Sequence, residues 1–329
     1  MRLTEVESQV LVRSQLEADR PAAEIARTLK IKEHTVRRAQ SRILDAGVFG
    51  RRASLNLSPL GLHEFNMYFS LTSKSLSTRR QLFSAIGSHS GIKWLLEMTG
   101  GYDGLVAILS PTFHGVAEIL DSLTRKYGNF LFAKEITSVV SFTYFGRRYL
   151  APRHSLSESL SADDHTDEAT IDEIDKRILR ALTEDDFSSF EIIARKVKIP
   201  PSTLRLRYEK LRQKGIIVGM IYNIKRLPPG IHAYRIQIYL GGFHVDVLAQ
   251  LKKLAQSEPG IVYIVRTIGS WDYELQYEGL DSREIVEFCD RLTHALGQAV
   301  INVVVRPIVD MKKRNSYPFP IGDEIGLSR

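Results

Sequence analysis

The chain has 329 residues but one cysteine, Cys289, and no apolar run that approaches the roughly 20 residues needed to cross a bilayer. A single cysteine cannot form an internal disulfide, which fits a reducing compartment. Its place in an apolar helical pattern favours a buried position over a nucleophile. The first residues also lack the apolar core of a signal peptide. We therefore expect a cytoplasmic protein without a membrane segment.

Catalytic and metal-binding motifs are missing as well. The sequence contains no Ser/His/Asp arrangement, no metal-ligand spacing and no phosphate-binding loop. We therefore expect no cofactor, no metal and none of the ordinary hydrolase, metalloenzyme or nucleotide-binding activities.

What is present is ordinary globular material with a basic bias. Hydrophobic residues make up 43% and charged residues 25% of the chain, so each domain can bury a core. The net charge of +7 is concentrated in two segments: residues 1–60 hold 11 Lys and Arg against 7 Asp and Glu, and residues 171–230 hold 13 against 8. This distribution indicates an acidic partner.

The strongest feature is an internal repeat. A separation of 168 positions aligns the first 50 residues with those from 171 onward, and a separation of 169 aligns the rest. The matched pairs include Leu11 with Leu179, Thr35 with Thr203, Arg37 with Arg205, Gly47 with Gly215, Gly100 with Gly269 and Asp103 with Asp272. Two copies of one two-part module are the simplest interpretation.

The repeat sets the expected domain organisation. Residues 1–60 and 171–230 form one kind of domain, and residues 61–150 and 231–315 form the other. Between the copies, residues 151–170 carry one Arg against five Asp and Glu together with several serines, which predicts a solvated linker. Residues 316–329 form a tail.

The amino-terminal part of each copy predicts three helices. The third runs from about Glu33 to Asp45 and from Pro201 to Lys214, and each ends at a glycine. Short β segments follow, and we expect a β-hairpin wing in each copy. Three helices with a tight turn and a wing describe a winged helix-turn-helix.

The third helices carry the candidate DNA-binding residues. Apolar spacing places Val36 and Ile43, and likewise Leu204 and Leu211, on the inner face. The outer face is rich in arginine and hydroxyl groups, which suit phosphates and base edges, although a merely solvated face is the alternative. The candidates are Thr35, Arg37, Arg38, Arg42, Ser202, Thr203, Arg205, Arg207 and Arg212, with Arg51 and Arg52 on the first wing and Lys225 and Arg226 after the second.

The carboxy-terminal part of each copy predicts the order βαββαβ. Alternating apolar residues from Phe65 to Leu71 and from Tyr234 to Leu240 indicate half-buried strands. The result is an α+β fold in which two winged helix-turn-helix domains alternate with two ferredoxin-like domains. Each such sheet leaves one face uncovered, and a second copy in the same chain or in another chain could cover it.

The turn between the second and third strands of each ferredoxin-like domain contains the candidate ligand residues. It holds Gly100, Tyr102 and Asp103 in one copy and Gly269, Trp271 and Asp272 in the other. A purely structural hairpin turn is one interpretation. The other is a small-molecule site, in which the aspartate receives an ammonium group and free backbone amides hold a carboxylate.

These motifs together resemble the Lrp/AsnC (feast/famine) transcription regulators. The resemblance rests on Ile25 to Val48, on its repeat Ile193 to Ile216, and on the two Gly-x-x-Asp turns. It implies RAM-type βαββαβ domains, binding to double-stranded DNA, an amino acid or similar effector at the turns, and homo-oligomers formed through the βαββαβ domains. Lys32 and Pro200 depart from the family's usual serine, and Ala39 and Leu206 occupy outer positions that are often basic.

One different class of protein shares this architecture. Lrp-like folds include the sirohaem decarboxylases, whose pattern has a histidine at the second turn, and no histidine stands at either turn here. His63 and its repeat His232 fall at the start of a predicted strand, where we expect edge residues and not catalysts. We therefore expect a regulator and not an enzyme, with the tetrapyrrole enzyme as the alternative.

Overall fold

The computed structural model describes residues 3–72, 75–129, 131–154, 158–164, 169–183, 189–225, 227–314 and 317. Arg226 and the expected tail 316–329, Tyr317 apart, lie outside these residues. Across the described part of the chain, no helix is long and apolar enough to span a membrane.

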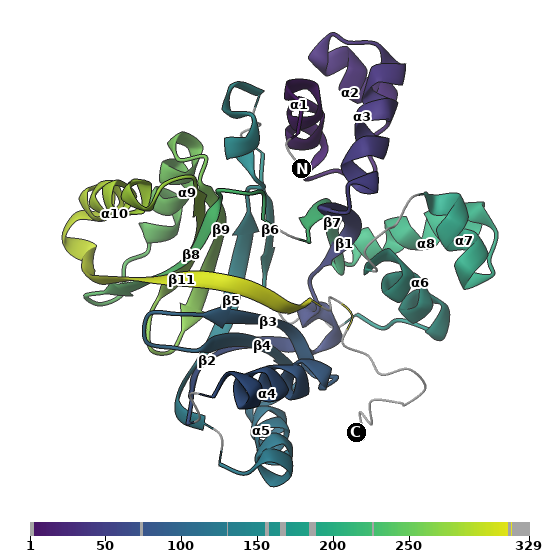
Figure 1. Ribbon diagram of the computed structural model, residues 1–329. Coiled ribbons are helices and arrows are strands. Elements are labelled where there is room, and N and C mark those ends of the chain that lie inside the picture. The colour runs from purple at the N-terminus through teal and green to yellow at the C-terminus, as the bar shows by residue number, and fades with distance from the viewer. Residues whose placement is uncertain are drawn as a thin grey trace.

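Each amino-terminal unit contains the three predicted helices (Figure 1). They are α1 (Glu5–Ser14), α2 (Ala22–Leu29) and α3 (Glu33–Asp45) in the first copy, and α6 (Glu173–Thr183), α7 (Phe190–Val197) and α8 (Pro201–Gln213) in the second. The turn before the third helix is built alike in both copies, because Lys30 and Lys198 adopt left-handed φ angles of 55° and 59°. The repeat therefore extends to the backbone conformation of the helix-turn-helix.

The expected hairpin wings are wrong. Each copy supplies one strand, and β1 (Phe49–Leu55) pairs antiparallel with β7 (Ile217–Ile224) from the other copy. Arg52 lies opposite Ile221, 169 positions later, so the two strands meet at equivalent residues in a local twofold arrangement. The partner strand comes from the duplicate because a single strand leaves its backbone groups unpaired.

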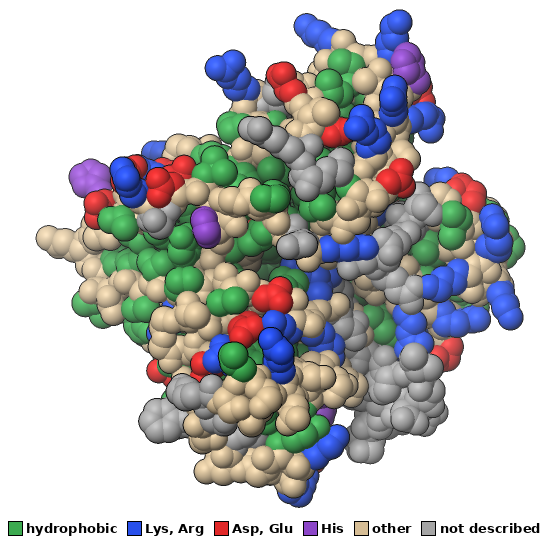
Figure 2. Space-filling model, viewed as in Figure 1, with side chains coloured by type: hydrophobic (Ala, Val, Ile, Leu, Met, Phe, Trp, Pro, Cys, Tyr) green, Lys and Arg blue, Asp and Glu red, His purple; other side chains and the backbone are tan. Residues whose placement is uncertain are grey.

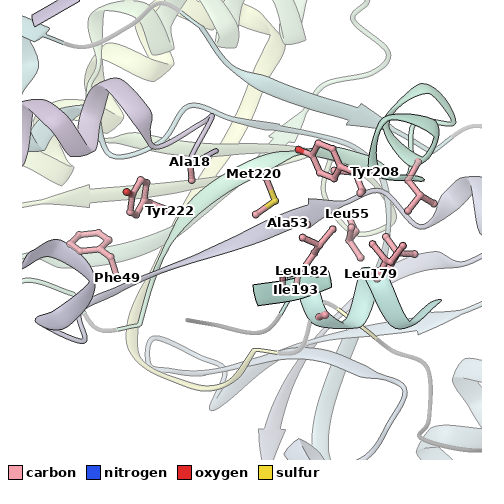
Figure 3. Close-up of a cluster of buried hydrophobic side chains, with 14 of the residues drawn as sticks. Ala18, Phe49, Ala53, Leu55, Leu179, Leu182, Ile193, Tyr208, Met220 and Tyr222 are labelled. Atoms are coloured by element: carbon pink, nitrogen blue, oxygen red, sulfur yellow. The ribbon is translucent and has the colours of Figure 1, made fainter. Parts of the chain in front are cut away.

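One hydrophobic core holds both helix-turn-helix units together. It joins side chains from the first unit, from the β1–β7 sheet and from the second unit, several of which are shown in Figure 3. Ala53 and Met220 of the paired strands belong to the same cluster as Ile25 of the first unit and Leu179 of the second. The two units are therefore packed together through one shared core.

The two βαββαβ units follow the predicted order. The first consists of β2 (His63–Leu71), α4 (Leu76–Ser88), β3 (Ile92–Met98), β4 (Gly104–Ser110), α5 (Phe113–Tyr127) and β5 (Leu131–Tyr144). The second consists of β8 (His232–Leu240), α9 (Val247–Ser257), β9 (Ile261–Ile268), β10 (Tyr273–Gly279), α10 (Ser282–Leu296) and β11 (Val300–Arg314). Short 3-10 helices lie at Ser58–Leu60, Arg148–Leu150, Pro152–His154 and Gly297–Ala299. His63 and His232 begin β2 and β8, as expected of edge residues.

The sheets of the two units join into one sheet that closes on itself. The strand order is β2-β4-β3-β11-β8-β10-β9-β5-β6, and β5 also pairs with β2. The long strands β5 and β11 make the junctions: β5 passes from β2 to β9, and β11 passes from β8 to β3. The four helices cover the outside, α4 with α5 and α9 with α10 (Figure 1). The partner of each sheet is therefore the duplicate in the same chain.

Closure changes the environment of the strands. Phe65 and Met67 face the covering helices, but Asn66 and Tyr68 between them are also buried, because they face the inside of the closed sheet. The prediction of half-buried strands is therefore wrong. We refer to the enclosed face as the interior.

The predicted linker is partly structured. Residues Leu160–Asp163 form β6, which pairs with β5 at the end of the sheet. Asn56 donates to the Asp163 carbonyl at 3.1 Å, and the His63 imidazole Nδ1 lies 2.8 Å from an Asp164 carboxylate oxygen. These contacts hold the acidic segment against both the first helix-turn-helix unit and the closed sheet.

Candidate nucleic-acid interface

The third helix of each unit presents a basic outer face. Val36 and Ile43 of α3 and Leu204 and Leu211 of α8 are fully buried, as predicted. Lys and Arg side chains gather over both helix-turn-helix units in Figure 2. The candidate arginines on the exposed face are Arg37, Arg38, Arg42, Arg205 and Arg212.

The arginines of α3 are held in different ways. Arg37 forms an ion pair with Glu33 one turn earlier, at 2.5 Å, and Arg42 lies 3.2 Å from the buried Glu7 of α1. Arg38 is exposed and has no ion pair with another described residue. Because exposed ion pairs contribute little energy, Arg37 and Arg38 can both turn to a phosphate or a base at low cost.

The arginines of α8 differ from one another in their surroundings. Arg205 is 63% exposed in its side chain and lies over the Phe190 ring, beside Glu191 at 3.5 Å. Arg207 instead binds Asp172, which directly precedes α6, at 2.7 Å and Asp175 of α6 at 2.8 Å. A hydrogen bond from the Asp175 backbone, followed by the Arg207 guanidinium, lowers the pKa of Asp172. Arg207 therefore braces its own domain, and Arg205 is the better DNA candidate.

The start of each third helix has open hydrogen-bond donors. Neither Lys32 before α3 nor Pro200 before α8 provides a side-chain cap. The first amides of α3 are therefore available to an anion, whereas in α8 Pro201 has no amide hydrogen and the donors begin at Ser202. The helix dipole favours negative charge at the start of both helices. Ser202 is exposed close to this end, and Thr35 and Thr203 are half-buried.

The structure corrects the expected basic stripe on the wing. Arg52 is buried and faces the interior. The Arg51 guanidinium donates to the Tyr222 hydroxyl at 2.9 Å across the β1–β7 sheet. Ala39 is buried too, so it is not an outer position of the recognition helix, whereas Leu206 is exposed as predicted.

The two turn aspartates perform the same structural task. Asp103 Oδ2 accepts a hydrogen bond from the Leu71 amide at 2.7 Å, and Asp272 Oδ2 accepts one from the Leu240 amide at 2.8 Å. Asp103 also forms an ion pair with Arg79 of α4. Gly100 and Gly269 have φ angles of 84° and 148°, which favour glycine. Each carboxylate therefore holds the end of the neighbouring strand.

The aromatic residues of these turns do not share one environment. Trp271 is fully buried, meets the Tyr68 ring edge-on at 4.8 Å and donates to the Glu274 carboxylate at 3.0 Å. Tyr102 is half-buried and lies under the Arg306 guanidinium, 4.4 Å from the ring centre. The turns of the two copies are therefore different surfaces for a ligand.

Sequence reasoning missed the polar residues of the interior. Arg235 and Glu274 are 5% and 0% exposed, and burial raises the pKa of Glu274 above its ordinary range. The signal lay in polar residues at alternate positions, Arg235 and Gln237 of β8 and Glu274, Gln276 and Glu278 of β10, on the face that was expected to meet a second sheet. Within the described residues, no group of three or more His, Cys, Asp or Glu side chains could hold a metal ion.

Comparison with known proteins agrees with this arrangement. Residues 171–218 match the family described as winged helix-turn-helix DNA-binding. The regulatory protein AsnC of Haemophilus influenzae is 43% identical over 49 residues, 15% of this chain and 33% of AsnC. The HTH-type transcriptional regulator Ptr1 of Methanocaldococcus jannaschii is 34% identical over 104 residues, 31% of this chain and 68% of Ptr1.

The chain belongs to the Lrp/AsnC family of transcription regulators. The first relatives that this Lrp/AsnC chain matches, AsnC among them, are covered over about a third of their length. These sequence relatives are named as a regulatory protein and a transcriptional regulator.

The fold of this Lrp/AsnC chain also occurs in an enzyme. The crystal structure of siroheme decarboxylase NirDL with an iron-uroporphyrin III analogue covers 96% of this chain and 94% of its own, with a TM-score of 0.61 and 11% identity. At that identity the likeness shows the shared architecture alone, a tandem of two modules.

Proposed function

We propose that this protein is a transcription regulator that binds double-stranded DNA through α3 and α8. The observation that carries the proposal is the pair of exposed arginine-rich helices, built alike by the repeat and linked by the β1–β7 sheet. Recognition helices on one rigid body favour two contacts on one duplex over independent binding.

The two contacts are unequal. Arg205 is free to turn to a base edge, and Arg207 is engaged with α6, whereas α3 offers Arg37 and Arg38 side by side. A dimer of identical single modules reads a palindrome, because its recognition helices are related by exact symmetry. The tandem chain is expected to prefer an asymmetric operator with two different half-sites.

A small-molecule effector is the second part of the proposal. The turns around Gly100 and Gly269 remain the candidate positions, with Tyr102 and Asp103 in one copy and Trp271 and Asp272 in the other. An amino acid is the effector class that the family resemblance implies. Because the closed sheet forms within one chain, homo-oligomers would form through the outer surfaces of the βαββαβ domains.

The tetrapyrrole alternative receives little support from the interior. The cavity there measures about 130 Å³, whereas drug-sized ligands, which are smaller than a tetrapyrrole, occupy roughly 300–1,000 Å³. A Soret band on the purified protein after addition of a sirohaem analogue would favour the decarboxylase.

The direct test is DNA binding measured over a range of salt concentrations, with promoter DNA and random DNA. We expect affinity to fall steeply with salt, with a slope of log affinity against log salt of about −0.9 for each phosphate contact. Promoter DNA should bind more tightly than random DNA at every salt concentration. Weak binding that is insensitive to salt would contradict the proposal.

A further inference from the structure

A leucine, Leu206, stands at the centre of the outer face of α8. The buried residues Leu204, Tyr208 and Leu211 define the side of the helix that faces the core. Leu206 lies midway between Leu204 and Tyr208 in the sequence, so in a helix with 3.6 residues per turn it points about 160° away from each. It is therefore almost opposite the core, and 59% of it is exposed.

Leu206 belongs to a row of exposed side chains along this outer face. Ser202 lies about one turn before it, and Glu209 and Gln213 lie about one and two turns after it. The exposed basic residues that flank this row are Arg205 and Arg212 on one side and Lys210 on the other. Because phosphates repel a carboxylate such as that of Glu209, the row suits the base edges in a groove better than the DNA backbone.

The repeat places a different residue at this position in each copy. Leu206 is equivalent to Arg38 of α3, 168 positions earlier, and Arg38 is exposed as well. Val36 of α3 is equivalent to Leu204 of α8, and both are fully buried, so the two helices turn the same side to the core. The two recognition helices therefore present a guanidinium group and a branched alkyl group at the same point.

These two groups select different bases. A guanidinium group pairs with O6 and N7 of guanine. The side chain of leucine has no donor or acceptor, and the apolar group that distinguishes a base in the major groove is the 5-methyl group of thymine. Single exposed leucines are common on protein surfaces. A leucine in the middle of a recognition helix differs from these, because contact with a thymine methyl group removes both apolar groups from water.

We infer that Leu206 is a specificity-determining residue that recognises thymine through its 5-methyl group, at the position of the α8 half-site where Arg38 recognises guanine in the α3 half-site. The inference rests on the proposed function, since it requires α8 to enter the major groove of DNA. It assigns the expected asymmetry of the operator to one base position in each half-site.

Replacement of thymine by deoxyuridine tests the methyl contact. Selection from random duplexes with the full-length protein first supplies a bound DNA site. Each thymine of that site is then replaced in turn by deoxyuridine, which keeps the base pair and lacks only the 5-methyl group. We expect one replacement to weaken binding about three- to fivefold, the effect of losing one buried methyl group. A site in which no thymine responds would overturn the inference.

The variant Leu206→Ala connects the effect to this side chain. It should bind the thymine duplex and the deoxyuridine duplex with equal affinity. The matched control is Leu280→Ala, which removes a leucine that is 67% exposed between β10 and α10 and should keep the full difference between the two duplexes. The same difference in Leu206→Ala as in the parent protein would contradict the inference.

The variant Leu206→Arg gives α8 the residue that α3 has at this position. Selection with this variant should return guanine in place of the responding thymine, so that the two half-sites become more alike. A selected site that keeps the thymine would also count against the inference.

The outcomes distinguish this inference from the proposed function. Binding that is sensitive to salt and selective for sequence, but indifferent to thymine methyl groups, would remove the role of Leu206 and leave the regulator in place. Absence of DNA binding would remove both.

Discussion

Arg235 Nη1 lies 3.8 Å from Glu274 Oε2, and both side chains are almost completely buried inside the closed sheet. The distance is long for an ion pair, and the pKa of Glu274 is raised by burial despite the attraction of Arg235 and the Trp271 hydrogen bond. Burying two charges costs more than a poorly hydrogen-bonded pair returns. The pair therefore contributes little to the stability of the closed sheet.

The arginines of the recognition helices give the first prediction. Arg37→Ala combined with Arg205→Ala should lose preference for promoter DNA by about 1–3 kcal/mol per base contact, because guanidinium groups read guanine edges in pairs of hydrogen bonds. The loss of preference is measured by competition binding with DNA sites that differ from the promoter site by one base pair. Uniform weakening on all sequences would instead assign both residues to phosphates.

Arg207→Ala is the matched control for that experiment. Since Arg207 binds Asp172 and Asp175 at the start of α6, one residue before it and one within it, its loss should lower the thermal midpoint of unfolding and leave the base preference unchanged. A changed base preference without a change in stability would contradict the bracing role.

The turn aspartates give the second prediction. Asp272→Asn and Asp103→Asn each weaken a charge-assisted hydrogen bond to a strand amide, so each should lower the free energy of unfolding by about 1–3 kcal/mol. The loss should be larger for Asp103→Asn, because Arg79 also loses one of its two ion-pair partners there and keeps only Glu97. Urea denaturation of both variants measures the difference, and an unchanged midpoint for Asp272→Asn would favour a ligand role alone.

The attachment of the first helix-turn-helix unit gives the third prediction. Gln15 Oε1 accepts from the Arg147 amide at 2.6 Å, and Arg147 forms two hydrogen bonds of 2.9 Å with the buried Glu278. Gln15→Ala leaves a buried amide unsatisfied, at a cost of about 1–3 kcal/mol. Hydrogen exchange should then speed up in α1 relative to α6. The control is Gln9→Ala, which removes only an exposed hydrogen bond to Glu5 and should leave the exchange rates of both helices unchanged.

The fourth prediction concerns pH. Burial, and then the nearby Lys313 ammonium, lower the pKa of His89, whose Nδ1 accepts from the Gly91 amide at 3.2 Å. Below about pH 6.5 the unfolded chain binds a proton at this site that the folded chain does not, so stability falls as the pH drops through that window. His89→Gln should flatten the dependence of the denaturation midpoint on pH between about 5 and 7. A His89→Gln protein whose denaturation midpoint falls with pH as in the parent protein would contradict this assignment.

Local features of the fold were predictable from sequence. The third helix of the first copy spans Glu33–Asp45 as predicted, because apolar spacing and the glycine after its end are local signals. The βαββαβ order followed from the same kind of pattern. The candidate interface was predicted less well: Arg52 is buried and Arg207 is engaged with α6, and both outcomes depend on contacts with segments distant in sequence.

The sequence by itself determined the helices, the strands, their order and their duplication, since each is encoded in spacing within a few residues. Only the tertiary structure decided that β1 pairs with β7 and that β5 and β11 close the sheet within one chain. Strand pairing joins backbone groups of distant segments, and these groups are nearly the same in every residue. The side-chain pattern of one strand therefore does not identify the strand with which it pairs. Closure then buried the second face of the strands, with charged side chains such as Arg235 in the walls of a cavity.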